Sequence, residues 1–267
     1  MKLLSNSAIV TGGSQGIGLA IASRLMREGT HVLVFGRTES KVVEAAERLN
    51  REGEGRARAV PFAGDVCRQT DVEKAHEFAT AQLGLPGILV NNAGSVSLHL
   101  LVDLPEEELD RLLGVNLKGP FLFMKTFARA LIAEKRPGAI VNVSSLCQSV
   151  VTEGFGHYSA SKAALAQLSR AAALELGRHS IRVNVVAPGA IHTPLAASFI
   201  DEPAMRRELL ARTPLGRPHG LPDDVARVVA FLCAEESSWV TGETLDVDGG
   251  SHLRGMHSYW DTLNPPR

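Results

Sequence analysis

Short, continuously apolar segments alternate with longer amphipathic segments along the whole chain of 267 residues. Residues 8–10 form the first apolar segment, a glycine-rich turn follows, and residues 17–28 carry apolar side chains at helical spacing. Strands that are apolar on both faces need cover on both faces, as in a parallel sheet flanked by helices. The alternation therefore predicts an α/β fold, with a single-domain, doubly wound and mostly parallel seven-stranded sheet and helices on both faces.

The spacing of the apolar side chains also predicts the order of the elements. Strands are expected at residues 8–10, 31–35, 59–62, 88–90, 139–143, 181–186 and 244–247. Helices are expected at 17–28, 39–51, 70–83, 105–113, 121–133, 158–176 and 222–234, and the fourth and fifth form one long helical region around Asn116. We expect one domain over residues 1–251, with an insertion at 190–215, followed by a tail at 252–267.

The formal net charge of -1 excludes the strongly basic surface of a typical nucleic-acid-binding protein. No apolar run is long enough to cross a bilayer and the first residues do not resemble a secretory signal, so we expect a cytoplasmic protein with no membrane partner. Cys67, Cys147 and Cys233 lack disulfide-motif or metal-ligand spacing, which favours buried or incidental thiols in a reducing compartment. The histidines also lack ligand spacing, so no metal site is predicted.

A glycine-rich turn, Thr11-Gly-Gly-Ser-Gln-Gly-Ile-Gly18, connects the first expected strand to the first expected helix. Glycines permit positive φ and let main-chain N–H groups approach a pyrophosphate at the helix N-terminus. A turn of this kind after the first strand of a doubly wound sheet is where a dinucleotide binds, although a purely structural tight turn has the same composition. The candidate cofactor residues here are Gly12, Ser14, Gln15, Gly16, Ile17 and Gly18.

The end of the second expected strand indicates which dinucleotide is preferred. An acidic residue there favours NAD by accepting hydrogen bonds from the ribose hydroxyls, whereas an arginine accommodates the 2′-phosphate of NADP. This chain has Gly36-Arg37-Thr38, and Arg37 can form a charge-assisted fork to phosphate. NADP(H) is therefore favoured over NAD(H), with two alternatives: Arg37 is a solvated loop charge, or the nearby Glu39 binds the ribose.

Tyr158 and Lys162 open an alanine-rich helix four residues apart, so they share one helix face. A nearby cation favours the phenolate and is expected to lower the pKa of Tyr158 from its usual value near ~10. Such a tyrosine can act as an acid or a base at neutral pH. Alone the pair is weak evidence, because surface tyrosines and lysines often have this spacing.

Further motifs follow other expected strands. Asn91-Asn92-Ala93-Gly94, Ser144-Ser145 and Pro188-Gly189 all lie where the carboxyl ends of strands meet, the edge at which open α/β sheets bind ligands. With the glycine turn and the Tyr158–Lys162 pair, the chain resembles the short-chain dehydrogenase/reductase family over about residues 5 to 251.

This resemblance implies roles for four residues. Tyr158 would be the general acid in carbonyl reduction and the base in alcohol oxidation. Lys162 would hold the nicotinamide ribose and lower the pKa of Tyr158. Ser145, thirteen positions before Tyr158, would hydrogen-bond the substrate oxygen, with Ser144 as the weaker candidate. Asn116 would position a water in a proton relay, unless it only kinks or caps its helix.

The resemblance also extends the cofactor site. Asp65 and Val66 would contact the adenine, although Asp65 could instead cap the end of a strand. Gln15 departs from NADP-preferring relatives, which often carry Arg or Lys at its position. The remaining cofactor residues implied by the family are Asn92, Ala93, Gly94, Tyr158, Lys162, Pro188, Gly189, Ile191 and Thr193.

The substrate site is less defined. Candidate substrate residues are Ser145, Gln148, Tyr158, Leu195 and Phe199. Gln148 replaces a glycine found in some family members, and it could face the substrate or support its loop. Residues 190–215 would form a substrate lid whose apolar face suits a hydrophobic or medium-sized molecule, though a helix packed on the body would look the same. The aromatic tail at 252–267 suits a subunit interface or a frayed terminus.

The resemblance implies an NAD(P)-dependent oxidoreductase that interconverts a carbonyl and a secondary alcohol of a small molecule. It also implies a homo-oligomer, either a tetramer or a dimer. One alternative is a catalytically silent NAD(P)-binding sensor or scaffold of the same fold. Another, an enoyl reductase, predicts a longer spacing than that between Tyr158 and Lys162.

Overall fold

The computed structural model describes residues 1–53 and 55–256 of the chain. Its seven-stranded sheet has the order β3-β2-β1-β4-β5-β6-β7, and every strand pair is parallel. The chain order of the strands reverses between β1 and β4, which creates the crevice where such sheets bind ligands. The strands are β1 (Ser7–Thr11), β2 (His31–Gly36), β3 (Ala59–Ala63), β4 (Ile88–Asn91), β5 (Gly138–Val143), β6 (Ile181–Pro188) and β7 (Thr244–Val247).

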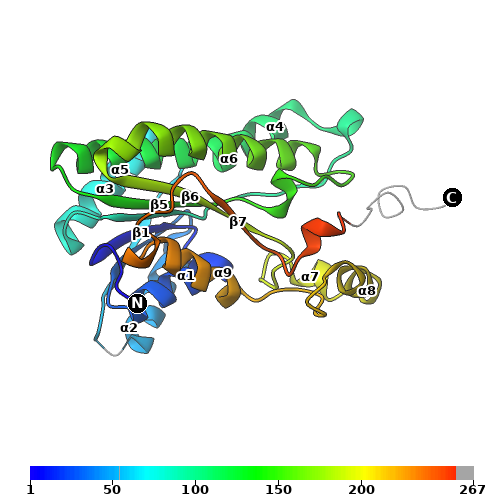
Figure 1. Ribbon diagram of the computed structural model, residues 1–267, viewed down its shortest axis with the longest axis horizontal. Coiled ribbons are helices and arrows are strands. Elements are labelled where there is room, and N and C mark those ends of the chain that lie inside the picture. Colours follow the sequence, from blue (N-terminus) through cyan, green and yellow to red (C-terminus); the bar gives the residue numbers. More distant parts are fainter. Residues whose placement is uncertain (54, 257–267) are drawn as a thin grey trace.

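Helices cover both faces of the sheet, as the apolar strands require (Figure 1). One face carries α1 (Gly16–Arg27), α2 (Glu39–Glu52) and α9 (Pro222–Leu232). The opposite face carries α3 (Gln69–Leu83), α4 (Glu106–Leu113), α5 (Gly119–Ala133) and α6 (Gly156–Leu176). The predicted doubly wound α/β fold is confirmed, and the sheet is entirely parallel rather than mostly parallel.

Alternate residues of each strand enter two separate cores. Ile9, Leu33 and Leu89 pack against α3 and α5, whereas Val10 and Val34 pack on the side of α1 and α9. All five side chains are fully buried. Burial on both faces explains why the strands read as unbroken apolar runs.

A buried polar chain connects the sheet to α6. The Asn142 side chain donates to Ser169 Oγ at 2.7 Å, and the Asn91 side chain donates to Asn142 Oδ1 at 2.8 Å. Buried polar groups are costly unless they are paired, so these bonds specify one rotation of α6 on β5 and β4. That rotation determines which side chains of α6 face the carboxyl edge of the sheet.

The predicted helical region at 105–133 contains an irregular segment. Residues Gly114–Lys118 form a π-helical turn between α4 and α5, and Asn116 lies within it. Single π-helical turns within helices occur frequently at functional sites. The helix at 158–176 also begins two residues earlier than predicted, at Gly156, so Tyr158 lies inside its first turn.

The segment 190–215 differs from the single apolar face expected for it. It contains two short helices, α7 (Ala197–Ile200) and α8 (Pro203–Arg212), because Pro203 starts a new helix. Leu209 is buried, but Leu210 is exposed. Two neighbouring leucines of α8 thus differ in exposure, so the apolar side chains of this segment do not form one buried face.

Five further short helical turns, all of the 3₁₀ type, occur in the described chain. They are at Leu101–Asp103, Leu146–Gln148, Gly177–His179, Glu235–Ser237 and Ser251–Leu253. Within the described residues, no helix is both long and apolar enough to span a membrane. His257, Tyr259 and Trp260 of the predicted aromatic tail lie outside the described residues.

The glycine turn between β1 and α1 brings three main-chain segments very close together. Gly12 has a φ of 62°, and a Cβ there would lie 2.9 Å from the Cα of Ala93. A Cβ on Gly18 would overlap the carbonyl oxygen of Gly12 and the side-chain amide of Asn92. Glycine is therefore required where α1 passes over the turn.

We predict that Gly18→Ala lowers the free energy of unfolding by roughly 1–3 kcal/mol, because main-chain atoms must move to admit the methyl group. Gly156→Ala is the matched control, since a Cβ at this helical glycine meets nothing within 4 Å. It should be neutral or stabilising by at most about 1 kcal/mol. Urea denaturation compares the two variants, and equal unfolding midpoints would contradict the close approach.

Candidate active site

Tyr158, Lys162 and Ser145 meet at the carboxyl edge of the sheet. Lys162 Nζ lies 5.8 Å from the centre of the Tyr158 ring and donates a hydrogen bond to the Val143 carbonyl at 3.0 Å. Ser145, which follows β5, hydrogen-bonds with the Tyr158 hydroxyl, and its Oγ also accepts from the Cys147 N–H. The structure therefore places two of the other predicted catalytic residues, Ser145 and Lys162, beside Tyr158.

The protonation of this pair differs from the sequence-based expectation. Burial raises the pKa of Tyr158 above its usual range, and the hydrogen bond with Ser145 opposes that shift only partly. Burial lowers the pKa of Lys162 to about 8. The expected lowering of the Tyr158 pKa is not found here, because burial of the phenol dominates and its hydrogen bond with Ser145 opposes the shift only partly.

Asn116 uses every hydrogen-bonding group of its side chain inside the protein. Its Oδ1 accepts from the Ser95 N–H at 2.8 Å, and its Nδ2 donates to the Ser95 carbonyl and to Ser161 Oγ. The residue is fully buried. A Cβ on Gly94 would lie 3.5 Å from Asn116 Oδ1 and 3.6 Å from Lys162 Nζ, which places Asn116 near Lys162 in the candidate site.

The two adjacent serines have different functions in the structure. Ser144 is buried, and its hydroxyl donates to the main-chain carbonyl of Lys162 at 3.1 Å. Ser145 is only partly buried and faces the Tyr158 hydroxyl. This arrangement favours Ser145 over Ser144 as the residue that meets the substrate oxygen.

The glycine turn and the segment after β4 are held together by hydrogen bonds. Thr11 Oγ1 accepts from the N–H groups of Asn92 and Ala93, both at 3.0 Å. The Asn92 side chain donates to the carbonyls of Thr11 and Gly12. Asn92 therefore shapes the cofactor cradle through its side chain, a structural role that the sequence analysis did not assign to it.

The start of α1 suits a phosphate group. Gln15 occupies the N-cap position with an extended backbone and makes no side-chain cap hydrogen bond to the described chain, so the first helical N–H groups are not satisfied in that way. Thr193, from the segment after β6, approaches the same turn: its Cγ2 would lie 3.3 Å from a Cβ on Gly16. These features fit a dinucleotide between the glycine turn and the segment after β6.

The remaining predicted cofactor residues lie along the same edge of the sheet. Asp65 Oδ1 accepts from the Cys67 N–H at 2.9 Å in the turn after β3, while Val66 packs against Gly119. Gly189 lies against Asp248, where a Cβ would come within 2.7 Å of the aspartate Cβ. Pro188 ends β6, and the buried Ile191 forms a bridge with Gly220.

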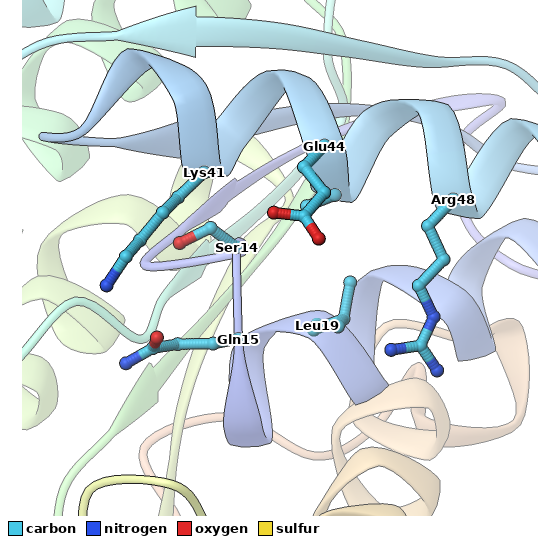
Figure 2. Close-up of a pocket in the computed structure, with 7 residues that line it drawn as sticks. Ser14, Gln15, Leu19, Lys41, Glu44 and Arg48 are labelled. Carbon is cyan, nitrogen blue, oxygen red and sulfur yellow. The ribbon is translucent and has the colours of Figure 1, made fainter.

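A cavity of about 170 Å³ lies between the glycine turn and α2 (Figure 2). Lys41, Glu44 and Arg48 project into it from α2, while Ser14 and Gln15 border it from the turn. Lys41 was not among the predicted site residues. Its position four residues after Arg37, on the first turn of α2, was the available signal.

The structure separates the predicted substrate residues. Gln148 is partly buried, and its Oε1 atom is buried without a hydrogen-bond partner in the described structure. Leu195 is exposed to 68%, and Phe199 lies half-buried in α7. Gln148 ends the 3₁₀ turn that follows Ser145, whereas Leu195 and Phe199 belong to the 190–215 segment.

The cysteines match their sequence-based interpretation. Cys147 and Cys233 are buried, Cys67 is partly buried, and all three are free thiols. Burial raises the pKa of each thiol. The described residues contain no group of three or more side chains arranged to hold a metal ion.

Known proteins resemble this chain over nearly its full length. A family model described as enoyl-(acyl carrier protein) reductase matches residues 12–252. A 4-formylbenzenesulfonate dehydrogenase from Comamonas testosteroni is 40% identical over 95% of this chain and 100% of the relative. A (3R)-3-hydroxyacyl-CoA dehydrogenase from Mus musculus is 36% identical over 94% of this chain and 97% of the relative.

Solved structures agree with these relatives. A short-chain type dehydrogenase/reductase from Mycobacterium ulcerans superposes with a TM-score of 0.93 at 30% identity, over 99% of this chain and 96% of that chain. The sequence matches and the structural match cover the same sheet and the same site. The chain therefore belongs to the short-chain dehydrogenase/reductase family of NAD(P)-dependent oxidoreductases.

Proposed function

We propose that this oxidoreductase interconverts a carbonyl and a secondary alcohol on a small molecule, with Tyr158 as general acid and base. The observation that carries the proposal is the convergence of Ser145, Tyr158 and Lys162 at the carboxyl edge of the sheet. The nicotinamide cofactor supplies or accepts the hydride when it is bound. The residues of the chain orient the substrate oxygen and move its proton.

Tyr158 holds its proton at neutral pH, because burial raises its pKa. In the reducing direction its hydroxyl protonates the substrate oxygen, and in the oxidising direction the phenolate takes the proton back. Ser145 hydrogen-bonds the same oxygen and stabilises the negative charge that develops on it. The structure supports this pairing because Ser145 already contacts the Tyr158 hydroxyl.

Lys162 and Asn116 resupply the proton. With its pKa lowered to about 8, Lys162 can exchange protons near neutral pH. The side chain of Asn116 is fully hydrogen-bonded, so its main-chain carbonyl is the group left to hold a relay water. Residue 120 is a proline, which has no N–H to donate to that carbonyl from the next helical turn.

The described site favours an active enzyme over a silent sensor or scaffold, since all four predicted catalytic residues are present and Ser145 and Lys162 both lie beside Tyr158. The matching family model is described as an enoyl reductase. We favour carbonyl chemistry because Lys162 follows Tyr158 by four residues, and an enoyl reductase predicts a longer spacing.

For the cofactor we propose NADP(H) over NAD(H). Arg37 is exposed at the end of β2, and Lys41 faces the cavity beside Ser14 (Figure 2). Two cations can together hold a 2′-phosphate, although the carboxylate of Glu44 in the same cavity opposes it. The segments around Asp65, Asn92 and Thr193 would contact the rest of the dinucleotide.

We also propose the domain organisation, the substrate class, the cellular location and the oligomeric state of the protein. Residues 1–251 would form the catalytic domain, with residues 190–215 as a lid over a hydrophobic or medium-sized substrate that meets Gln148, Leu195 and Phe199. The relatives act on an aromatic aldehyde and on hydroxyacyl thioesters according to their names, so both classes belong in a substrate screen. We also propose a cytoplasmic homo-oligomer, with the tail at 252–267 at a subunit interface.

We predict that Tyr158→Phe lowers kcat by at least about 10²-fold while NADPH still binds, because only the proton donor is removed. Turnover is measured on a panel of ketones, aldehydes, sugars, steroids and acyl thioesters, and cofactor binding by NADPH fluorescence. Tyr259→Phe, which changes the other of the two tyrosines, is the control and should keep full activity. An active Tyr158→Phe enzyme would rule out the acid–base assignment.

We predict that Arg37→Asp shifts the preference towards NAD by at least about tenfold, since it replaces a phosphate-binding cation with a ribose acceptor. Lys41→Ala should weaken NADP use to a smaller degree. Arg48→Ala is the control, because Arg48 is already bonded to Glu52 at 2.7 Å. The ratio of kcat/KM for NADP and NAD is the readout, and a ratio unchanged by Arg37→Asp would refute the phosphate role.

We predict that Lys162→Met inactivates the enzyme but stabilises the fold at neutral pH. Burial holds the pKa of Lys162 at about 8, below its unfolded value near ~10.4, so the folded state is penalised below pH 8. That penalty is relieved as the pH rises from about 8 towards the unfolded value. The variant should therefore gain up to about 3 kcal/mol in free energy of unfolding at neutral pH, and the gain should shrink in this window.

Urea denaturation at a series of pH values measures the effect. Lys41→Met is the matched control, because Lys41 is exposed and should show no such trend. A gain in stability for Lys162→Met that does not change between neutral and alkaline pH would show that the buried charge is not its source.

A further inference from the structure

A closed ring of hydrogen bonds links Asn116 to the helical turn that carries Tyr158. On one side, Asn116 Nδ2 donates to Ser161 Oγ at 3.0 Å, and Ser161 donates to the main-chain carbonyl of Tyr158 at 2.7 Å. On the other side, Asn116 holds both main-chain polar groups of Ser95. The ring is completed by a second set of side chains, from Ser95 back to the residue before Tyr158.

The second half of the ring runs over α4. Ser95 Oγ accepts from Arg111 at 2.8 Å, and Arg111 makes a two-pronged ion pair with Glu108 at 2.6 and 2.7 Å. Glu108 is hydrogen-bonded with the Ser97 hydroxyl, and Ser97 Oγ lies 2.8 Å from His157 Nε2. Because a carboxylate only accepts, Ser97 donates to Glu108 and accepts from the Nε2–H of His157.

The ring reaches from the buried site to the protein surface. Asn116 and Ser161 are fully buried and His157 is 5% exposed, whereas the Arg111 side chain is 44% exposed. A two-pronged arginine–carboxylate pair is among the more rigid polar contacts in proteins. Arg111 and Glu108 thus anchor two otherwise separate loop positions, Ser95 and Ser97, to α4.

The charges of the ring are constant over the range in which an enzyme works. Arg111 and Ser97 lower the pKa of Glu108 to about 2. Burial lowers the pKa of His157, and His99 and Arg111 add to this while Glu108 opposes it. His157 is therefore a neutral donor at neutral pH, and Glu108 is ionised.

We propose that Arg111 and His157 are positioning residues of the oxidoreductase reaction, which act through the ring to hold Asn116 and the Tyr158 turn in one fixed relation. This inference rests on the proposed roles of Tyr158 and Asn116. The ring leaves the main-chain carbonyl of Asn116 as the site for a relay water. It also fixes the Ser95–His99 segment, whose His99 N–H donates to the carbonyl of Gly154 next to the start of α6.

The effect of breaking the ring is a loss of alignment rather than of a reacting group. Removal of Arg111 takes a partner from the Ser95 hydroxyl and from Glu108, and removal of His157 takes one from the partly buried Ser97 hydroxyl, so the segment after β4 loses its attachment to α4 or to α6. A shift of about 1 Å in catalytic groups can cost on the order of 10²-fold in rate. The cofactor cradle does not share these bonds, because Thr11 and Asn92 hold it separately.

The test compares variants that keep or remove the hydrogen-bond donor of His157. His157→Gln places an amide donor near the position of Nε2, whereas His157→Asn places one near Nδ1, and His157→Ala has none. Each is assayed with NADPH and the carbonyl compound of the panel that the wild-type enzyme reduces fastest. We expect His157→Ala, His157→Asn and Arg111→Ala to lower kcat by roughly 10–100-fold and His157→Gln to restore most of it.

Three further readouts separate positioning from general loss of structure. The dissociation constant for NADPH, measured by fluorescence, should stay within about twofold of wild type, while the solvent isotope effect on kcat should rise as the proton step becomes limiting. The double variant Arg111→Ala/His157→Ala should lose little more than either single variant, because both break the same ring. Arg227→Ala, which breaks a surface pair with Asp223 on α9, is the control and should leave kcat unchanged.

The outcomes are distinct. Wild-type kcat in Arg111→Ala or His157→Ala, or equal losses in the Gln and Asn variants of His157, would overturn the positioning role. Strictly multiplicative losses in the double variant would show that the two residues act separately. If Tyr158→Phe remains active, the proposed catalytic function itself fails, and this result is independent of the ring.

Discussion

The parallel sheet with its reversal between β1 and β4 is the constraint on which the whole site depends. Because every strand runs in the same direction, the glycine turn, the segment after β4, the serine after β5 and the loop after β6 all emerge at one edge. Helices on both faces exclude water from the strands, and this burial requires the strand side chains to be apolar. The residues of the candidate site lie at the ends of the strands instead, among them Ser145, Asn92 and Gly189.

Desolvation and hydrogen bonding compete at this edge, and the outcome differs for each group. Lys162 is almost completely buried, yet it keeps one carbonyl partner, and its pKa falls to about 8. Burial raises the pKa of Tyr158, and the hydrogen bond with Ser145 offsets this rise only in part, so Tyr158 retains its proton. The buried lysine thus lowers the stability of the fold, and in the proposed mechanism it provides a group beside the phenol that can exchange protons.

Two buried polar networks give α6 its position. Asn142 and Ser169 set the rotation of the helix on the sheet, and Asn116 and Ser161 hold its first turns against the segment after β4. Each link joins elements that are far apart in the chain. Their residue types, asparagine and serine, are common throughout the sequence, so the pairing of particular residues cannot be inferred from spacing alone.

The sequence by itself determined the order of strands and helices and the parallel sheet, because apolar periodicity carries that information, while the four candidate catalytic residues came from its resemblance to a known family. It also placed Tyr158 and Lys162 on one helix face. Only the tertiary structure decided the direction of the Tyr158 pKa, since that depends on burial by remote segments. The break in the 190–215 segment, the nearness of Lys41 to the glycine turn, and the ring through Arg111 and His157 likewise follow from contacts between distant residues, which no local pattern encodes.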